Sequence, residues 1–293
     1  MHVLKFEAIG TTWEILFPDA NEDSLVAQNL SQLVPETITE FDKNYSRFRN
    51  DSLIQQFQNV QHNIAVPEEL VEMLLYYIPL YHLSNGKFTP TIGSLLEQKG
   101  YDATYSFMEG PSHSPPDLLQ AIEIHDNTTI SVLEPVLLDL GALGKGYLVD
   151  KVSLLIRSAL GNDTSFTINA GGDIYHLQTK EKHSLTVGLE HPSKPDRVIG
   201  TVPIRNEAIC SSAGNRRKWR QYHHIMDPLT QVSVNDTIAT WVIAQEAVVA
   251  DALATAMFFI EPERLRSQYQ FEFCRISNNQ VSASGRFQEG LLL

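Results

Sequence analysis

Two stretches of the chain carry side chains that suit phosphate and metal chemistry. In the first, Leu137 to Asp150, Lys145 and three glycines follow Asp139 within seven residues. Glycines let a backbone approach a ligand closely, amides at a helix start attract anions, and an ammonium is a point charge suited to phosphate. The spacing fits neither the phosphate loop of nucleotide triphosphatases nor Gly-x-Gly-x-x-Gly. The stretch is therefore either an anion site or a structural turn.

The second stretch is the apolar helix predicted around Asp251 and Thr255. Residues four apart lie on one helix face, so the carboxylate and the hydroxyl are expected one turn apart. A buried acid is unfavourable unless it is paired or bound to a metal, and two hard oxygens suit magnesium. The alternative is structural: the helix dipole stabilises Asp251, and Thr255 bonds back to a carbonyl.

Three further segments carry polar groups beside turns. Residues 222–228, Tyr-His-His-Ile-Met-Asp-Pro, offer an imidazole that is either a base or a structural residue. Residues 169–173, Asn-Ala-Gly-Gly-Asp, form a glycine turn after a predicted strand. Residues 211–218 bring three cations into one loop, which is either an anion contact or a solvated turn.

Composition excludes several classes of partner. The formal net charge of −13 over 293 residues disfavours nucleic acid and anionic membrane surfaces, which select basic faces. No window reaches the ~20 apolar residues of a membrane-spanning helix, and no secretory signal is visible. We expect a cytoplasmic protein, or an exported one if a leader has been trimmed. The two cysteines, Cys210 and Cys274, are expected to be reduced and buried.

Hydrophobic patterns predict a mixed α+β fold in which antiparallel strands dominate the second half and helices pack on them. The expected elements are a hairpin over 3–17, a hairpin over 122–133, helices over 25–41, 67–81, 148–160 and 247–260, and a short strand over 135–138 before the glycine turn. We expect a single domain over 1–293, with 101–117 as a possible subdivision.

Seven short motifs, taken together, are more specific than any one of them. They are Ala8-Ile-Gly-Thr-Thr-Trp13, Tyr45-Ser-Arg-Phe48, Gly86-Lys-Phe-Thr-Pro-Thr91, Asp139-Leu-Gly-Ala-Leu-Gly-Lys-Gly-Tyr-Leu-Val-Asp150, Asn169-Ala-Gly-Gly-Asp-Ile174, His223-His-Ile-Met-Asp-Pro228 and Ala250-Asp-Ala-Leu-Ala-Thr-Ala256. In this order they resemble the motifs of the FAD:protein FMN transferases, also called ApbE-like flavin transferases. The resemblance runs from about residue 5 to the C-terminus.

The resemblance implies a magnesium-dependent enzyme that transfers FMN from FAD to a threonine or serine hydroxyl of an acceptor protein, such as a redox-enzyme subunit, and releases AMP. It implies that His224 is the candidate base and that Asp251 is also catalytic. The magnesium ligands would be Asp251, Thr255, the Ala142 carbonyl and a backbone contact from Val248. The FAD contacts would be Ile9, Lys87, Phe88, Thr89, Asp139, Lys145 and His224.

Three residues depart from the family motifs. Ile9, Thr89 and Gln231 occupy positions where the family has methionine, aspartate and glycine. We expect these departures to affect FAD affinity and the choice of acceptor more than the reaction class, and Gln231 also to alter the turn after His224. Two other functions stay open: a flavin-binding module without transfer, and an FAD pyrophosphatase in which water replaces the acceptor hydroxyl.

Overall fold

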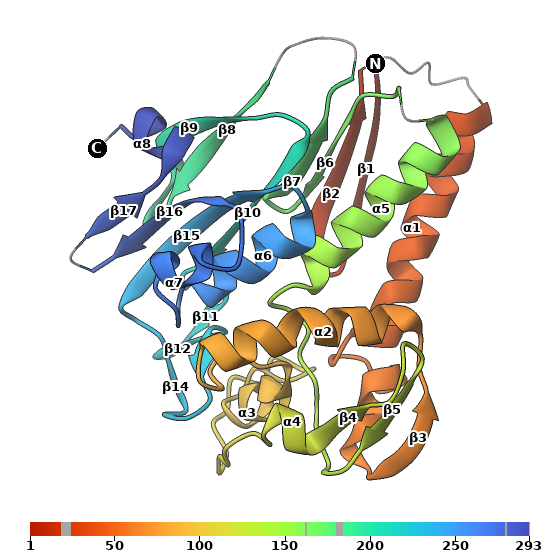
Figure 1. Cartoon of the computed structure of the whole chain (residues 1–293), viewed down its shortest axis with the longest axis vertical. Coiled ribbons are helices and arrows are strands. Elements are labelled where there is room, and N and C mark those ends of the chain that lie inside the picture. Colours follow the sequence, from red (N-terminus) through yellow and green to blue (C-terminus); the bar gives the residue numbers. More distant parts are fainter. Residues whose placement is uncertain (19–24, 162, 180–183, 279, 293) are drawn as a thin grey trace.

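The fold is built on an eight-stranded sheet (Figure 1). The computed structural model describes residues 1–18, 25–161, 163–179, 184–278 and 280–292. Neighbouring strands of the sheet all pair antiparallel, which confirms the predicted fold class. In sheet order the strands are β1 (His2–Ala8), β2 (Thr11–Phe17), β6 (Phe166–Ala170), β7 (Asp173–Leu177), β10 (Glu207–Ala213), β15 (Thr237–Ala244), β16 (Glu272–Ser277) and β17 (Val281–Ala283).

Both faces of this sheet are covered, so its central strands are apolar on both sides. In β15, Val242 and Ala244 join the larger core cluster, whereas Trp241 and Ile243 face the smaller one. This alternation follows from the two-residue period of a strand. A strand buried on both faces contains a nearly continuous apolar run, as in residues 241–244, Trp-Val-Ile-Ala.

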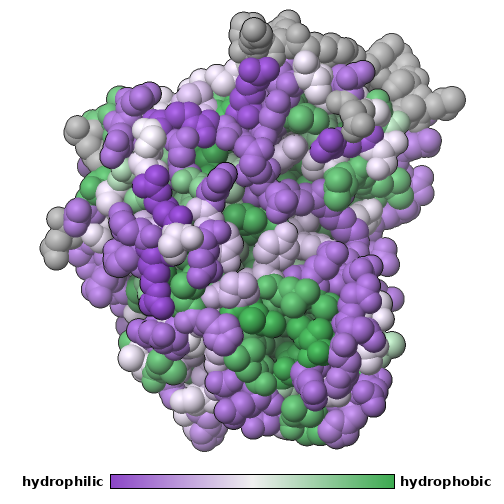
Figure 2. Space-filling model, in the orientation of Figure 1, coloured by the Kyte–Doolittle hydropathy of each residue, from purple (hydrophilic) through white to green (hydrophobic). Residues whose placement is uncertain are grey.

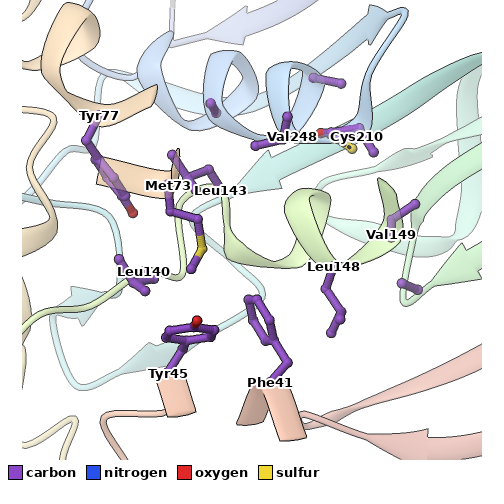
Figure 3. Packing of buried hydrophobic residues seen from close by; sticks show 14 of the residues in the cluster. Phe41, Tyr45, Met73, Tyr77, Leu140, Leu143, Leu148, Val149, Cys210 and Val248 are labelled. Atoms are coloured by element: carbon purple, nitrogen blue, oxygen red, sulfur yellow. Dashed lines mark hydrogen bonds between the residues drawn. The ribbon is translucent and has the colours of Figure 1, made fainter. Parts of the chain in front are cut away.

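Helices α1 (Leu25–Tyr45), α5 (Gly144–Leu160) and α6 (Ala247–Ala256) cover one face of the sheet (Figure 1). Phe41 and Tyr45 of α1 pack in one cluster with Tyr77 of α2 (Glu68–Leu83) and with Leu140 and Leu143 of the glycine turn (Figure 3). This cluster connects the predicted glycine turn to α1 and α2.

The opposite face is covered by the hairpin of β8 (Leu185–His191) and β9 (Lys194–Ile204) and by α8 (Gly285–Gly290). Leu189, Val202 and Phe287 fill the core between these elements and the sheet.

A second layer of shorter elements adjoins the ends of α1 and α5 (Figure 1), and apolar side chains gather on the surface of this lower part of the molecule (Figure 2). It contains α2 (Glu68–Leu83), α3 (Gly93–Gln98), α4 (Leu118–Ala121), the short 3₁₀ helices Leu53–Gln58 and Pro90–Ile92, and a sheet of β3 (Gln61–Ala65), β5 (Thr129–Val132) and β4 (Ile122–Ile124). The remaining elements are the strand pairs β11 (Lys218–Trp219) with β12 (Tyr222–His223) and β13 (Met226–Asp227) with β14 (Val232–Ser233), and helix α7 (Pro262–Arg266).

The predicted hairpins and helices are confirmed, with α6 ending at Ala256 rather than near residue 260. The strand predicted over 135–138 is wrong. Val136, Leu137 and Leu138 are buried, but Val136 N–H donates to the Phe57 carbonyl (2.8 Å), and Asp139 N–H, just after the segment, donates to the Pro90 carbonyl (2.7 Å). Its backbone therefore bonds to two 3₁₀ helices instead of a neighbouring strand.

Residues 101–117 are an irregular segment apart from the cap of α4, and their aromatic rings pack against Trp219. Both cysteines are free and buried, as predicted. Within the described ranges, no helix combines the length and the apolar character needed to cross a membrane.

Candidate active site

A cavity of about 310 Å³ opens where the β1–β2 turn, the start of α5, the end of β10 and one face of α6 meet. Most of the predicted site residues line it, although they come from four separate parts of the sequence: Lys87, Phe88, Thr89, Asp139, Ala142, Lys145, His224, Asp251 and Thr255. Gly10, Thr11, Tyr101, Ser212, Arg216 and Arg217 lie in the same walls.

Two predicted residues do not line this cavity. Ile9 lies next to it in the β1–β2 turn with φ +45°, a conformation that is unusual for a β-branched residue. The Val248 side chain is buried in the core (Figure 3), and its N–H donates to Asp150 Oδ2 (2.8 Å). Val248 borders a different cavity, between α2 and α5.

Asp251 and Thr255 face the cavity from successive turns of α6, as their spacing predicts. Asp251 Oδ2 accepts a hydrogen bond from Gly146 N–H (2.9 Å) at the start of α5. A Cβ at Gly146 would lie 2.3 Å from the Ala247 carbonyl, so only glycine permits this approach. Thr255 Oγ1 bonds Ser212 Oγ (2.8 Å), which disfavours the alternative that it serves a helix carbonyl.

Lys145 forms an ion pair with Asp173, which is almost fully buried. Asp173 also accepts a hydrogen bond from Ser211 N–H (3.3 Å). Burial alone would lower the pKa of Lys145, but the carboxylates of Asp173 and Asp251 raise it above its ordinary value. The ammonium is therefore charged and already bound to a protein carboxylate.

Two buried acidic side chains, Asp173 and Asp251, lie near a single ammonium, that of Lys145. Burial raises the pKa of Asp251, and the negative charge of Asp173 raises it further. Asp251 Oδ1 has no hydrogen bond to the described residues, so it is available to a cation. One carboxylate, one hydroxyl and a backbone carbonyl fit a hard divalent cation that keeps part of its water shell. In the described part of the chain, no three His, Cys, Asp or Glu side chains form a metal cluster.

Asp139 is held by Arg47, a residue that the sequence analysis did not select. Arg47 Nε lies 2.5 Å from Asp139 Oδ2, and Gly141 N–H donates to Oδ1 (2.8 Å). Burial would raise the pKa of Asp139, but the Arg47 ion pair, the hydrogen bond from Gly141 and the charge of Arg217 together outweigh it, so the net shift is downward. The Arg47 guanidinium also lies over the rings of Phe48 and Tyr101, at 4.1 and 4.8 Å from their centres. Asp139 is thus ionised and rigidly placed.

The two adjacent histidines have different environments. His223 Nε2 bonds the Val234 carbonyl (2.9 Å) and its Nδ1 accepts from Ile225 N–H (3.3 Å), so this ring is structural. His224 lines the cavity, and its Nδ1 is buried without a hydrogen-bond partner in the described residues. Burial, followed by the charge of Arg217, lowers the pKa of His224 to about 3. The His224 imidazole is therefore neutral near pH 7.

The turn after His224 contains one of the departures from the family motifs. Gln231 has φ +60°, the left-handed conformation that favours glycine, and its N–H donates to the Asp227 carbonyl (2.8 Å). The backbone thus keeps a glycine-like turn. The Gln231 side chain accepts from Ser112 Oγ (2.7 Å), which ties this turn to the 101–117 segment. Lys87 Nζ lies 2.9 Å from Asp227 Oδ2 in the same turn.

Among the three departures from the family motifs, Thr89 is the one that lines the cavity. Its hydroxyl bonds Thr91 Oγ1 (2.8 Å) and caps the Pro90–Ile92 helix through Thr91 N–H (3.2 Å). This hydroxyl is occupied inside the protein. The neighbouring Phe88 is buried, with its ring 5.1 Å from that of Tyr77.

Comparison with known proteins gives the same family as the motifs. The sequence profile of the ApbE family matches residues 9–273. The chain belongs to the ApbE family. An FAD:protein FMN transferase of Escherichia coli is 21% identical over 283 residues, which cover 90% of this chain and 80% of that protein. Another from Treponema pallidum is 28% identical over 237 residues, covering 69% of this chain and 62% of that protein.

Solved ApbE structures share the fold. The ApbE protein of Thermotoga maritima superimposes with a TM-score of 0.85 at 22% identity, covering 98% of both chains. The flavin transferase ApbE of Vibrio cholerae gives a TM-score of 0.78 at 23% identity, covering 99% of both chains. These comparisons agree with the family resemblance that the motifs showed.

Proposed function

We propose that this ApbE-family chain is a magnesium-dependent FAD:protein FMN transferase that acts on a threonine or serine hydroxyl of an acceptor protein. The observation that carries the proposal is that one cavity gathers a carboxylate and hydroxyl pair, a neutral imidazole and several cations. The names of the curated relatives support it.

In this proposal Asp251 Oδ1, Thr255 Oγ1 and the Ala142 carbonyl would hold Mg²⁺. Its charge would balance the buried carboxylates and neutralise charge that develops on phosphoryl oxygens. Val248 is left out of this set because it lies outside the cavity. Asp173 has the separate task of fixing Lys145, whose ammonium points into the same cavity.

The reaction is a displacement at phosphorus. The acceptor hydroxyl oxygen bonds the FMN phosphorus, the bond from that phosphorus to the bridging oxygen breaks, and AMP leaves with both bonding electrons. His224 takes the hydroxyl proton, which requires the neutral imidazole that burial maintains. The phosphates of bound FAD would offset the positive field of Arg217 and raise the pKa of His224, making it a stronger base.

Single-turnover kinetics test the two central residues separately. Substituting His224→Ala should slow FMN transfer by roughly 100-fold or more while changing FAD affinity by only a few-fold, because general bases act on the chemical step. Asp251→Ala should abolish AMP release and keep part of the FAD binding. Equal losses of rate and affinity in His224→Ala would make it a binding residue, and full turnover by Asp251→Ala would refute the metal site.

A further inference from the structure

The cations that line the cavity differ in their partners. Lys87 is bound to Asp227, Lys145 to Asp173, and Arg216 to Glu190 at 2.8 Å. Arg217 also lines the cavity, yet its guanidinium has no ion pair or hydrogen bond to any described residue. Of the two arginines that line the cavity, Arg217 is the one whose charge no carboxylate of the described residues pairs with.

The backbone places Arg217 beside the proposed base. The Arg217 carbonyl accepts a hydrogen bond from His224 N–H (3.3 Å), and the following strand pair β11–β12 fixes the loop through the buried ring of Trp219. Lys218, the next residue, is exposed and does not line the cavity. Of these two adjacent cations, Arg217 therefore lines the cavity and Lys218 does not.

The charge of Arg217 acts on groups inside the cavity. Besides burial, it is the largest cause that lowers the pKa of His224. The pKa of Tyr101 is raised by burial, and Arg217 opposes that shift more than any other residue. The Arg217 side chain lines the cavity and is exposed to solvent, so a ligand in the cavity can reach it.

We propose that Arg217 binds the pyrophosphate of FAD; this inference rests on the proposed function. A guanidinium can donate two parallel hydrogen bonds to phosphate oxygens, and a free one breaks no ion pair to do so. Lys145 would have to share its ammonium with Asp173. Arg217 is therefore the main cationic contact for the phosphates of the dinucleotide, in addition to the lysine that the family resemblance implies.

Equilibrium binding to the full chain in magnesium buffer tests the proposal with FAD and riboflavin as probes, since riboflavin lacks both phosphates. Arg217→Ala should weaken FAD binding by roughly 10- to 100-fold, the range for hydrogen bonds between charged groups, and riboflavin binding by less than about twofold. The FAD affinity of Arg217→Lys should lie between those of the wild type and Arg217→Ala, because an ammonium keeps the positive charge but cannot donate two parallel hydrogen bonds. Lys218→Ala removes an adjacent positive charge outside the cavity and should change FAD binding by less than about twofold.

Three results would overturn the proposal: unchanged FAD affinity in Arg217→Ala, an equal loss for FAD and riboflavin, or an equal loss in Lys218→Ala. AMP release by the wild type, measured in parallel, separates the two hypotheses. If the wild type binds FAD without releasing AMP, the proposed transferase fails while the role of Arg217 is still decided by the binding series. If the wild type binds no FAD, both are refuted.

Discussion

Asp251 is buried, accepts a hydrogen bond from the start of α5, and has one oxygen without a hydrogen bond to the residues that the structure describes. These three features determine how the site should respond to pH. Its pKa is raised by burial and by Asp173, so protons compete with a cation for the carboxylate. Ionisation, and with it cation binding, is favoured as pH rises.

We therefore expect Mg²⁺ affinity to increase with pH above the ordinary aspartate value of 3.8, by up to about tenfold per unit while the carboxyl is protonated. Calorimetric titration with Mg²⁺ from about pH 5.5 to about pH 9 measures it. Asp251→Asn, of nearly the same shape, should bind weakly and without this dependence. A wild-type affinity that does not change with pH would contradict the account of Asp251.

Residue types and spacing predicted that Asp251 and Thr255 lie one turn apart on the same face of a helix, because a separation of four residues fixes this relation locally. They did not predict Arg47 or the ion pair of Lys145 with Asp173. Those partners are 92 and 28 residues away in sequence from Asp139 and Lys145, and only the folded chain brings them together. The Asn-Ala-Gly-Gly-Asp motif contained Asp173, but nothing in it indicated a lysine partner.

At the scale of elements, the site depends on how α5 meets α6. Asp150 of α5 accepts hydrogen bonds from Ala247 N–H (2.9 Å) and Val248 N–H (2.8 Å), and so caps the first turn of α6. Burial raises the pKa of Asp150 to about 6. The same two helices meet again where Gly146 bonds Asp251, so the cap and the proposed cation site lie along one interface.

Substituting Asp150→Ala should lower the free energy of unfolding by about 1–2 kcal/mol, as expected for a lost helix cap, and should also weaken Mg²⁺ binding because α6 carries two of the proposed ligands. Denaturant unfolding and metal titration measure these effects. Lys151→Ala, which breaks a partly exposed ion pair to Glu69, should change stability by less than about 1 kcal/mol. If Asp150→Ala and Lys151→Ala lower the free energy of unfolding equally, the Asp150 cap does not contribute the stability expected of it.

Elements with strong periodicity were predictable, including both hairpins and the long helices. The strand over 135–138 was not, because an apolar run shows that a segment is buried but not which groups its backbone bonds. The turn at Gln231 shows a related limit. Its left-handed backbone is a property of the folded turn and its bonds, which the residue type did not reveal.

At the scale of the whole molecule, the cavity joins the β1–β2 turn, α5, α6 and the loop after β10, and it borders the second layer at Lys87. Ligand bound there contacts parts of both layers. Binding should therefore stabilise the native chain as a whole rather than a single element.

FAD with Mg²⁺ should raise the free energy of unfolding by about 2.7 kcal/mol at a free ligand concentration of 100 times Kd. Thermal unfolding at increasing FAD concentrations measures this effect, and Asp251→Ala should abolish the part that depends on magnesium. A melting temperature that does not respond to FAD would place the ligand site elsewhere.

The most direct test of the transferase is to incubate the purified chain with FAD, Mg²⁺ and a protein domain that carries a candidate threonine or serine site. AMP and the intact mass of the acceptor are measured in the same sample. The account predicts one AMP released for each acceptor that gains one covalent FMN, and loss of both products when the acceptor hydroxyl is removed by Thr→Val or Ser→Ala. The acceptor should be one that a related transferase is able to modify. If AMP and free FMN then form at a rate that does not depend on this acceptor, the chain is a pyrophosphatase, which contradicts the central claim.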